Sequence, residues 1–122
     1  MKKFILSSKV WLSSESGEGI MGIGKLTLLK KIRETGSIMV AAKELNISYR
    51  KAWGDIKKAE EFLGIKLLEK HRGGKHGGQT ILTKTGINVI NAFDSFYYDY
   101  SAIFNKSSVF FLDELNKIQK NE

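Results

Sequence analysis

Apolar residues recur at helical spacing in residues 38–45, and a short polar break follows them. Ser37 has the side chain preferred at an N-cap, so the spacing predicts a helix of about two turns. The break is formed by Asn46, which tolerates a left-handed conformation, and Ile47, which offers an apolar plug. A short helix that ends in such a turn predicts a second helix packed across it.

The second predicted helix follows Ser48, which is a suitable N-cap, and ends at Leu63 before Gly64. At about 100° per residue, its core face comprises Ala52, Ile56, Ala59 and Leu63. A basic flank beside that face carries Arg50, Gly54 and Lys57. The pattern over residues 37–63 is therefore typical of a helix-turn-helix motif.

The flanking sequence predicts a β-hairpin over residues 4–23 and a helix over residues 24–35. Phe4 and Lys9 through Ser13 form the expected first strand, in which Trp11 is interpreted as a packing residue. The helix should bury a stripe of Leu28, Leu29 and Ile32. Together with the helix-turn-helix, it predicts a three-helix core.

Downstream, residues 66–82 read as strand, Gly-rich tip and strand, which predicts a hairpin of the "wing" type. Thr83 then caps a helix expected to end near Phe104, and a further helix is expected over residues 107–120. We assign the chain to the mainly α (α+β) class, as one winged helix-turn-helix domain over residues 1–122.

The helices of residues 84–120 carry more apolar surface than a small domain can cover, which favours self-association. A dimer is also what the recognition of paired half-sites requires. The residues expected at the interface share aromatic or aliphatic side chains; they are Leu28, Ile90, Phe93, Tyr97, Tyr100, Phe104, Phe110 and Phe111.

Charge is distributed unevenly along the chain, whose net charge is +7. Residues 43–84 hold ten Lys or Arg against five acids, whereas residues 85–122 hold three against five. A basic helix-turn-helix favours a polyanionic partner, although the same charge can also serve solubility alone. The absence of cysteine is typical of an intracellular protein, and no stretch approaches the ~20 apolar residues of a membrane span.

The expected partner is double-stranded DNA, with the second helix of the motif in the major groove. Arg50 suits a guanine edge, Lys57 suits a phosphate, and Ser48 and Tyr49 can donate hydroxyls to phosphate. Trp53 either packs against neighbouring helices or reaches a thymine methyl or sugar. Lys51 and Lys58 are interpreted as a solvated face.

Catalytic and metal chemistry find little support in this sequence. The two histidines, His71 and His76, lie on the predicted wing without the converging ligands that a metal site needs. The Gly-rich tip at 73–78 lacks the Gly-Lys-Ser/Thr and following helix of a nucleotide-binding loop. We therefore expect neither an enzyme nor a cofactor.

Several motifs together carry a family resemblance: Gly36-Ser37-Ile38, Ala41-Ala42, Ile47-Ser48-Tyr49, Ala52-Trp53, the Gly-Gly-Lys-x-Gly-Gly tip at 73–78 and Leu-Thr-x-x-Gly at 82–86. The chain resembles the winged helix-turn-helix of LysR-type regulators. It is more closely similar to the N-terminal domain of the molybdate-responsive ModE family, from about residue 8 to residue 104. It looks like a stand-alone form without that family's molybdate-binding domains.

The resemblance implies a dimeric, prokaryotic, cytoplasmic transcriptional regulator. It matches Ser48, Tyr49, Arg50, Trp53 and Lys57 to the recognition helix, and Arg72, Lys75, His76 and Thr80 to the wing. Three alternatives stay open from the sequence: a molybdate- or tungstate-responsive sensor, a protein-interaction module using the aromatic C-terminal helices, and a nonspecific chromosome-coating protein. Whether a small-molecule effector exists is unknown.

Overall fold

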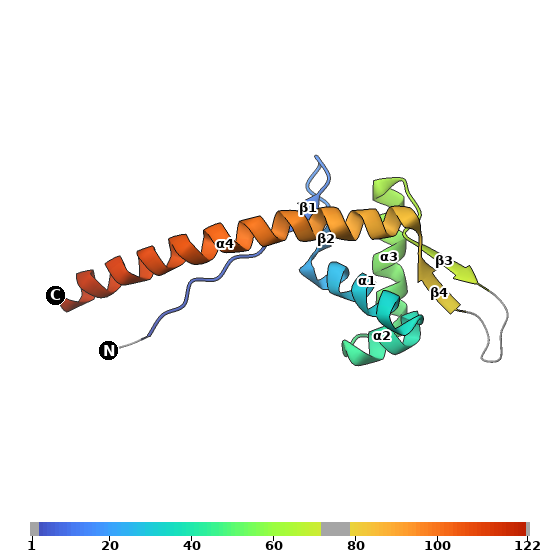
Figure 1. Cartoon of the computed structure of the whole chain (residues 1–122), viewed down its shortest axis with the longest axis horizontal. Coiled ribbons are helices and arrows are strands. Elements are labelled where there is room, and N and C mark those ends of the chain that lie inside the picture. Colours follow the sequence, from blue (N-terminus) through green and yellow to red (C-terminus); the bar gives the residue numbers. More distant parts are fainter. Residues whose placement is uncertain (1–2, 72–78, 122) are drawn as a thin grey trace. The chain divides into compact units, whose positions relative to one another are not determined.

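In the part of the chain that the structure describes, three short helices, two strand pairs and one long helix are present (Figure 1). The computed structural model describes residues 3–71 and 79–121, and it separates into two units, Val10–Asn91 and Met1–Lys9 with Ala92–Glu122. The elements are β1 (Trp11–Ser13), β2 (Gly19–Gly22), α1 (Ile23–Thr35), α2 (Ile38–Glu44), α3 (Tyr49–Leu63), β3 (Leu68–His71), β4 (Gln79–Leu82) and α4 (Lys84–Lys120).

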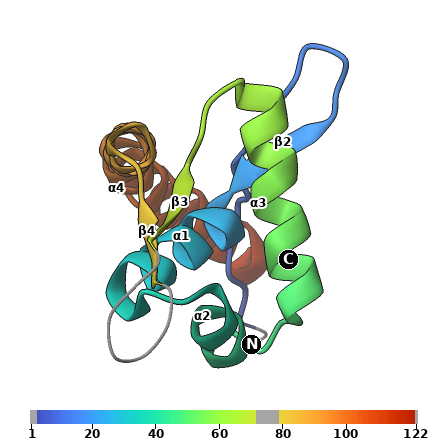
Figure 2. The same cartoon turned by 90° about the vertical axis from the view of Figure 1, so that its right-hand side faces the viewer.

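The predicted helix-turn-helix is present in α2 and α3 (Figure 2). Ser37 Oγ accepts a hydrogen bond from the Val40 amide at 3.1 Å, and Ser48 Oγ accepts one from the Lys51 amide at 3.0 Å. Asn46 has φ 58°, so the turn uses the left-handed conformation expected of it. Both caps and the turn between them are thus encoded by local side-chain chemistry.

The core of the unit Val10–Asn91 lies between α1, α2 and α3 and includes the stripe expected on α1. Leu29 and Ile32 are buried there, as are the small residues Ala41 and Ala42 of α2 and Ala52 of α3, which allow close helix packing. On α3, Ile56 and Ala59 are buried as expected. Leu63 is only half-buried, and the fourth buried position is taken by Glu60.

Two residues expected at a dimer interface lie in this core instead. Leu28 is 1% exposed and Ile90 is 0% exposed. Neither side chain can reach a partner while the domain stays folded, so their assignment to the interface is wrong. The periodicity of α1 and of the first turns of α4 reports burial, but it does not distinguish the protomer's own core from an interface.

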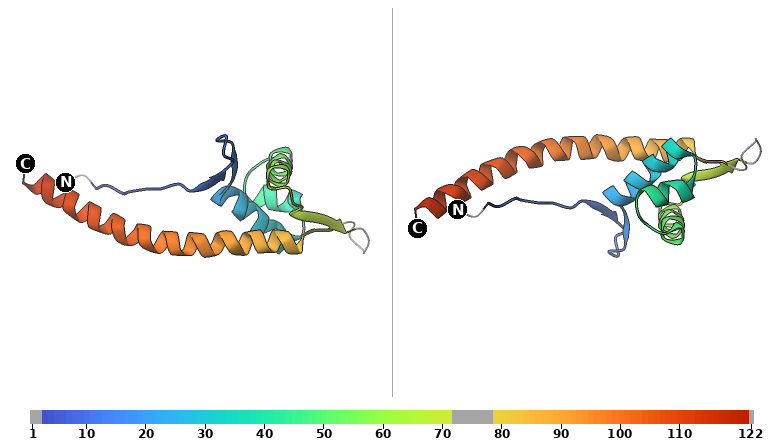
Figure 3. Two further views of the ribbon diagram at one scale, coloured as in Figure 1. Left: turned by 90° about the horizontal axis from the view of Figure 1, so that it is seen from above. Right: turned by 90° about the horizontal axis from the view of Figure 1, so that it is seen from below.

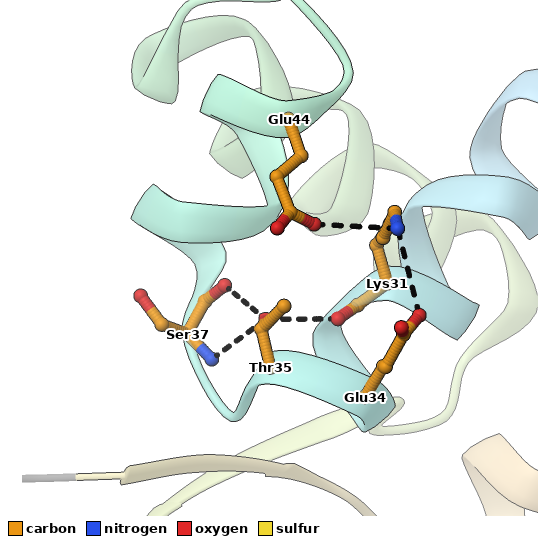
Figure 4. Close-up of polar contacts among 5 residues, drawn as sticks. All are labelled: Lys31, Glu34, Thr35, Ser37 and Glu44. Atoms are coloured by element: carbon orange, nitrogen blue, oxygen red, sulfur yellow. Dashed lines mark hydrogen bonds and ion pairs between the residues drawn. The ribbon is translucent and has the colours of Figure 1, made fainter.

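A polar cluster joins α1 to α2 (Figure 4). Lys31 Nζ lies 3.3 Å from Glu44 Oε2 and 3.6 Å from Glu34 Oε2, while the Thr35 hydroxyl donates to the Lys31 carbonyl at 2.8 Å. The hydrogen bond to Glu44, followed by the charge of Glu34, raises the pKa of the Lys31 ammonium. Lys31 therefore bridges the two helices.

The strands β3 and β4 form the predicted hairpin, with Lys70 opposite Thr80 in an antiparallel register. The Thr80 amide donates to the Gly36 carbonyl at 2.9 Å, which attaches the hairpin to the turn between α1 and α2. Gly36 has φ 72°, and an added Cβ would lie 3.0 Å from Gln79 Nε2, so two constraints favour glycine there.

The Leu-Thr-x-x-Gly motif fastens the start of α4 to the start of β3. Thr83 Oγ1 accepts from the Gly86 amide at 2.8 Å, as an N-cap does, and donates to the Lys66 carbonyl at 2.6 Å. Gly86 packs against Leu67 so closely that an added Cβ would lie 2.4 Å from the Leu67 carbonyl oxygen. The glycine is therefore required by close backbone approach.

Two expectations about element boundaries are wrong. The first hairpin pairs only Trp11–Ser13 with Gly19–Gly22, and residues 4–10 form no strand. Trp11 is 55% exposed. The break expected between residues 104 and 107 is absent, because α4 is one helix from Lys84 to Lys120, continuous in both views of Figure 3. Asn105 to Ser108 contain neither Gly nor Pro, so no residue there forces a helix to end.

The second unit carries a ladder of aromatic rings along α4. Phe93 stacks on Tyr97 with ring centroids 6.5 Å apart, and Tyr100 stacks on Phe104 at 5.9 Å. Phe96 stacks on Tyr100 at 5.9 Å as well. The helix therefore presents a contiguous aromatic stripe, which continues toward the exposed side chains of Phe110 and Phe111.

Candidate nucleic-acid interface

Helix α3 separates structural from exposed residues around its circumference. Its buried face consists of Ala52, Ile56, Ala59 and Glu60. On the flank beside it, Arg50, Gly54 and Lys57 are exposed, and Tyr49 is exposed at the first turn. An added Cβ on Gly54 would meet nothing within 4 Å. This flank is open to a ligand along the length of the helix.

The Ser48 hydroxyl, which was expected to donate to a phosphate, is already engaged in part. Its hydroxyl oxygen is engaged as the N-cap acceptor, which leaves its hydrogen able to donate. The side chain is exposed at the helix N-terminus, where backbone amides and the helix dipole favour an anion. Ser48 and Tyr49 therefore lie where hydroxyl contacts to a phosphate are chemically reasonable.

Trp53 is half-buried and carries two ammonium groups over its indole ring. Lys57 Nζ lies 4.5 Å from the ring centroid, and Lys70 Nζ, from β3, lies 5.1 Å from it. Both distances are within the range of cation–π attraction. Trp53 therefore packs between α3 and the hairpin and still belongs to the basic surface, so its two expected roles are compatible.

Glu60 ties α3 to β3 from below this surface. It is 7% exposed, and its Oε2 accepts from the Leu67 amide at 2.8 Å and the Leu68 amide at 3.2 Å. Lys57 Nζ lies 3.4 Å from Oε1. Burial raises the pKa of the Glu60 carboxyl, but the two amides and the Lys57 ammonium together outweigh it and lower that pKa overall.

Lysines also gather on the back of α3, away from the open flank. Burial, and then the charges of Lys58 and Lys51, lower the pKa of Lys25, which Asp55 partly offsets. Lys25 Nζ donates to the Ile20 carbonyl at 2.6 Å, and Lys51 pairs with Asp55 at 3.1 Å. Lys51 and Lys58 are both exposed, and their charges act on Lys25 of α1.

The wing residues are only partly described. Arg72, Lys75 and His76 lie outside the described residues. Thr80, on β4, is half-buried. His71 is exposed, and its Nε2 lies 3.3 Å from Glu69 Oε1. Within residues 3–71 and 79–121, no group of three or more His, Asp or Glu side chains is placed to hold a metal ion.

Lys70 and Glu60 were not singled out from the sequence as site residues. The period of two along β3 offered a signal for Lys70, because it places Lys70 on the same face as the half-buried Leu68. Glu60 carries no such signal, since a helical pattern alone does not predict a buried carboxylate.

The chain matches known proteins over the unit that contains this surface. A family model described as "Bacterial regulatory helix-turn-helix protein, lysR family" matches residues 23–87. The chain is 39% identical over 70 residues to the DNA-binding transcriptional dual regulator ModE of Escherichia coli strain K12, which covers 57% of this chain and 27% of that protein. No described helix is long and apolar enough to cross a membrane.

Two further comparisons agree. The molybdenum-pterin-binding protein MopB of Rhodobacter capsulatus is 37% identical over 73 residues, 60% of this chain and 27% of that protein. The chain thus spans about a quarter of the length of these curated relatives. The fold is similar to a crystal structure of a CbnR_DBD–DNA complex, with a TM-score of 0.58 and 22% identity over 73% of this chain and 97% of that one. The winged helix-turn-helix fold is confirmed.

Proposed function

Because the chain belongs to the lysR family of bacterial regulatory helix-turn-helix proteins, we propose that it is a sequence-specific, DNA-binding transcriptional regulator. It acts on double-stranded DNA as a homodimer in the prokaryotic cytoplasm. Relatives named as transcriptional regulators support this function, although each is much longer than the matched region. The fold similarity to a DNA-bound domain supports the mode of docking.

The observation that carries the proposal is the open flank of α3. Arg50 and Gly54 are exposed there, while the opposite side of the helix packs in the core. A major groove admits one helix, and a guanidinium can donate two hydrogen bonds to guanine O6 and N7. The flank therefore has the shape and the donors that direct base recognition needs.

The homodimer is supported by the aromatic stripe of α4. Phe111 is 49% exposed and follows Phe104 and Tyr97 at seven-residue intervals, a spacing that keeps side chains on one seam of paired helices. Phe93 and Tyr100 are half-buried beside them, and Phe110 lies at the edge of the stripe. A second copy of this helix would cover the apolar surface that a monomer leaves in water.

Binding selection tests the proposal. Purified protein is incubated with fragmented genomic DNA at about 150 mM salt, where backbone attraction alone is weakened, and the recovered fragments are sequenced. A shared two-fold motif is the expected result. Diffuse recovery that disappears as salt rises would leave nonspecific backbone binding in its place.

Recognition by Arg50 is tested on the motif so obtained. Arg50→Ala should lose about 1–3 kcal/mol on the selected site and little on random DNA, because a base contact discriminates. Lys75→Ala should weaken both duplexes alike, as a phosphate contact does. Fluorescence anisotropy titrations of both variants on both duplexes measure this, and equal losses throughout would contradict the division of roles.

A further inference from the structure

A groove of about 440 Å³ lies between α3 and the β3–β4 hairpin, on the same side as the open flank. Its apolar wall includes Ile38, Trp53 and Leu68. Its polar lining holds the lysines Lys57, Lys66 and Lys70, the glutamates Glu60 and Glu69, and the threonines Thr80 and Thr83. The groove is therefore built from the recognition helix and the hairpin together. The sequence already assigns Lys57 to a phosphate and lets Trp53 reach a sugar, but it assigns no ligand to Lys70 or to the groove as a whole.

The two lysines converge from different elements. Lys57 Nζ and Lys70 Nζ lie 4.5 Å and 5.1 Å from the same indole centroid, and both lysines line the groove. Lys57 shares its charge with Glu60 at 3.4 Å. Among residues 3–71 and 79–121, no acid lies within ion-pair distance of Lys70, so its positive charge is available to an anion.

The groove's chemistry selects its occupant. The aromatic floor suits the apolar part of a ligand. The two lysines suit an anionic part of the same ligand, which can accept hydrogen bonds from both ammonium groups. A deoxyribose with its phosphate has this character: the sugar packs on an aromatic face, and the phosphate accepts from ammonium donors. The neighbouring Arg50 flank places the groove beside the surface that would read bases.

We propose that Trp53, Lys57 and Lys70 form one binding site for a single sugar–phosphate of the DNA backbone, shared between the recognition helix and the wing. The inference rests on the proposed function for its partner, DNA, but not for sequence preference. By holding the same phosphate as Lys57, Lys70 then fixes the angle at which α3 enters the major groove of the DNA.

A double-mutant cycle tests the shared phosphate. Lys57→Gln, Lys70→Gln and the double variant are titrated with a short random-sequence duplex, with Lys58→Gln on the back of α3 as the matched control. If one phosphate is held by both lysines, the double variant loses clearly less than the product of the two single losses, because the first removal already disrupts the grip. Its salt slope falls by about 1 rather than about 2.

Losses that multiply, together with a slope reduced by about 2, would overturn the proposal, since they describe two independent phosphates. Thermal unfolding of each variant confirms that it is folded. Because the cycle uses a random duplex, it tests the shared phosphate separately from sequence-specific regulation. If the binding selection yields no motif, sequence-specific regulation is contradicted and the phosphate site is not. If the losses in the cycle multiply, the shared phosphate site is contradicted and sequence-specific regulation is not.

Fluorescence supplies a second, direct readout. The chain has two tryptophans, so Trp11→Phe leaves Trp53 as the sole indole emitter. Saturating duplex should shift or quench the emission of Trp53, because the sugar–phosphate replaces water at the ring. The change should be lost in the Lys57→Gln/Lys70→Gln background at equal occupancy. Unchanged emission of Trp53 at saturation would also overturn the proposal.

Discussion

Gly86 is the residue whose replacement is most tightly constrained by its surroundings. A Cβ there would lie 2.4 Å from the Leu67 carbonyl oxygen, a backbone atom that cannot move without shifting β3. We expect Gly86→Ala to lower the free energy of unfolding by about 1–3 kcal/mol through overpacking, despite the higher helix propensity of alanine. Chemical denaturation monitored by circular dichroism measures it.

Gly24→Ala is the matched control for this substitution. Gly24 also lies in a helix, and an added Cβ there meets nothing within 4 Å, so stability should stay equal or rise. A Gly86→Ala variant as stable as the Gly24→Ala variant would show that the start of α4 does not approach β3 so closely.

Glu60 predicts a pH dependence of stability. Its folded pKa lies below that of the unfolded chain, so the unfolded state binds more protons and stability rises with pH. Glu60→Gln should cost about 1–3 kcal/mol at neutral pH, where two amide bonds to a charged acceptor weaken. This cost should shrink as the pH falls below about 4.3 and through the lower folded pKa.

Denaturation midpoints of the wild type and of Glu60→Gln across that pH range measure the effect. Glu61→Gln, at the exposed neighbouring position, should track the wild type at every pH. A gap between Glu60→Gln and the wild type that stays constant down to low pH would mean that the carboxylate charge contributes nothing to the tie between α3 and β3.

Residue-level prediction from the sequence succeeded where the cause is local. Ser37, Ser48 and Asn46 are recognisable because a cap or a left-handed turn depends on a side chain and its own backbone. It failed for Glu60 and Lys70, whose partners lie on other elements. A carboxylate that accepts amides seven and eight residues away has no local pattern.

At the scale of elements, Gly54 is a cost within α3 that nothing in the described structure repays. Glycine inside a helix is about 1 kcal/mol less favourable than alanine, and its site is open. We expect Gly54→Ala to stabilise the free protein by up to that amount and to weaken DNA binding, because a methyl group would hold the duplex away from α3.

Unfolding curves and DNA titrations on the same preparation of Gly54→Ala separate the two effects. Gly24→Ala, in α1 and outside the flank of Arg50 and Gly54, should leave DNA affinity unchanged. If Gly54→Ala gains stability and binds DNA as tightly as the wild type, then DNA does not approach this part of the helix closely.

Elements themselves were predicted well where periodicity was strong, as in α1, α2, α3 and the β3–β4 hairpin. The sequence does not reveal how far β1 extends, because the length of a strand depends on the strand it pairs with, and β2 pairs only with Trp11–Ser13. Nor does it exclude a break in α4, since the polar residues 105–108 lower helix propensity without ending the helix.

For the whole molecule, the proposed dimer makes the strongest prediction. Phe111→Glu places a charge in the aromatic stripe and should weaken self-association by about 10-fold or more, as substitution of a buried aromatic anchor does. Val109→Glu is the control, because Val109 is 58% exposed on the opposite side of α4. Sedimentation velocity over a range of protein concentrations measures both.

A wild-type chain that sediments as a monomer at micromolar concentration would contradict the dimer. Equal weakening by both substitutions would instead place the interface elsewhere on α4.

The family resemblance noted in the sequence is confirmed by the comparisons, and the LysR-type fold with it. The oligomeric state cannot be predicted in the same way. The exposed apolar stripe of α4 indicates that something covers it, but not whether a second copy or another protein does.

The division of labour around α3 has a consequence for how such proteins diversify. Its core face and the Glu60 tie fulfil the demands of folding, whereas Arg50 and Gly54 make no contact that the described domain needs. Mutations on that flank can therefore accumulate without an intervening loss of stability. Under the proposed function, a descendant of this chain can acquire a new DNA site one substitution at a time while inheriting the same scaffold.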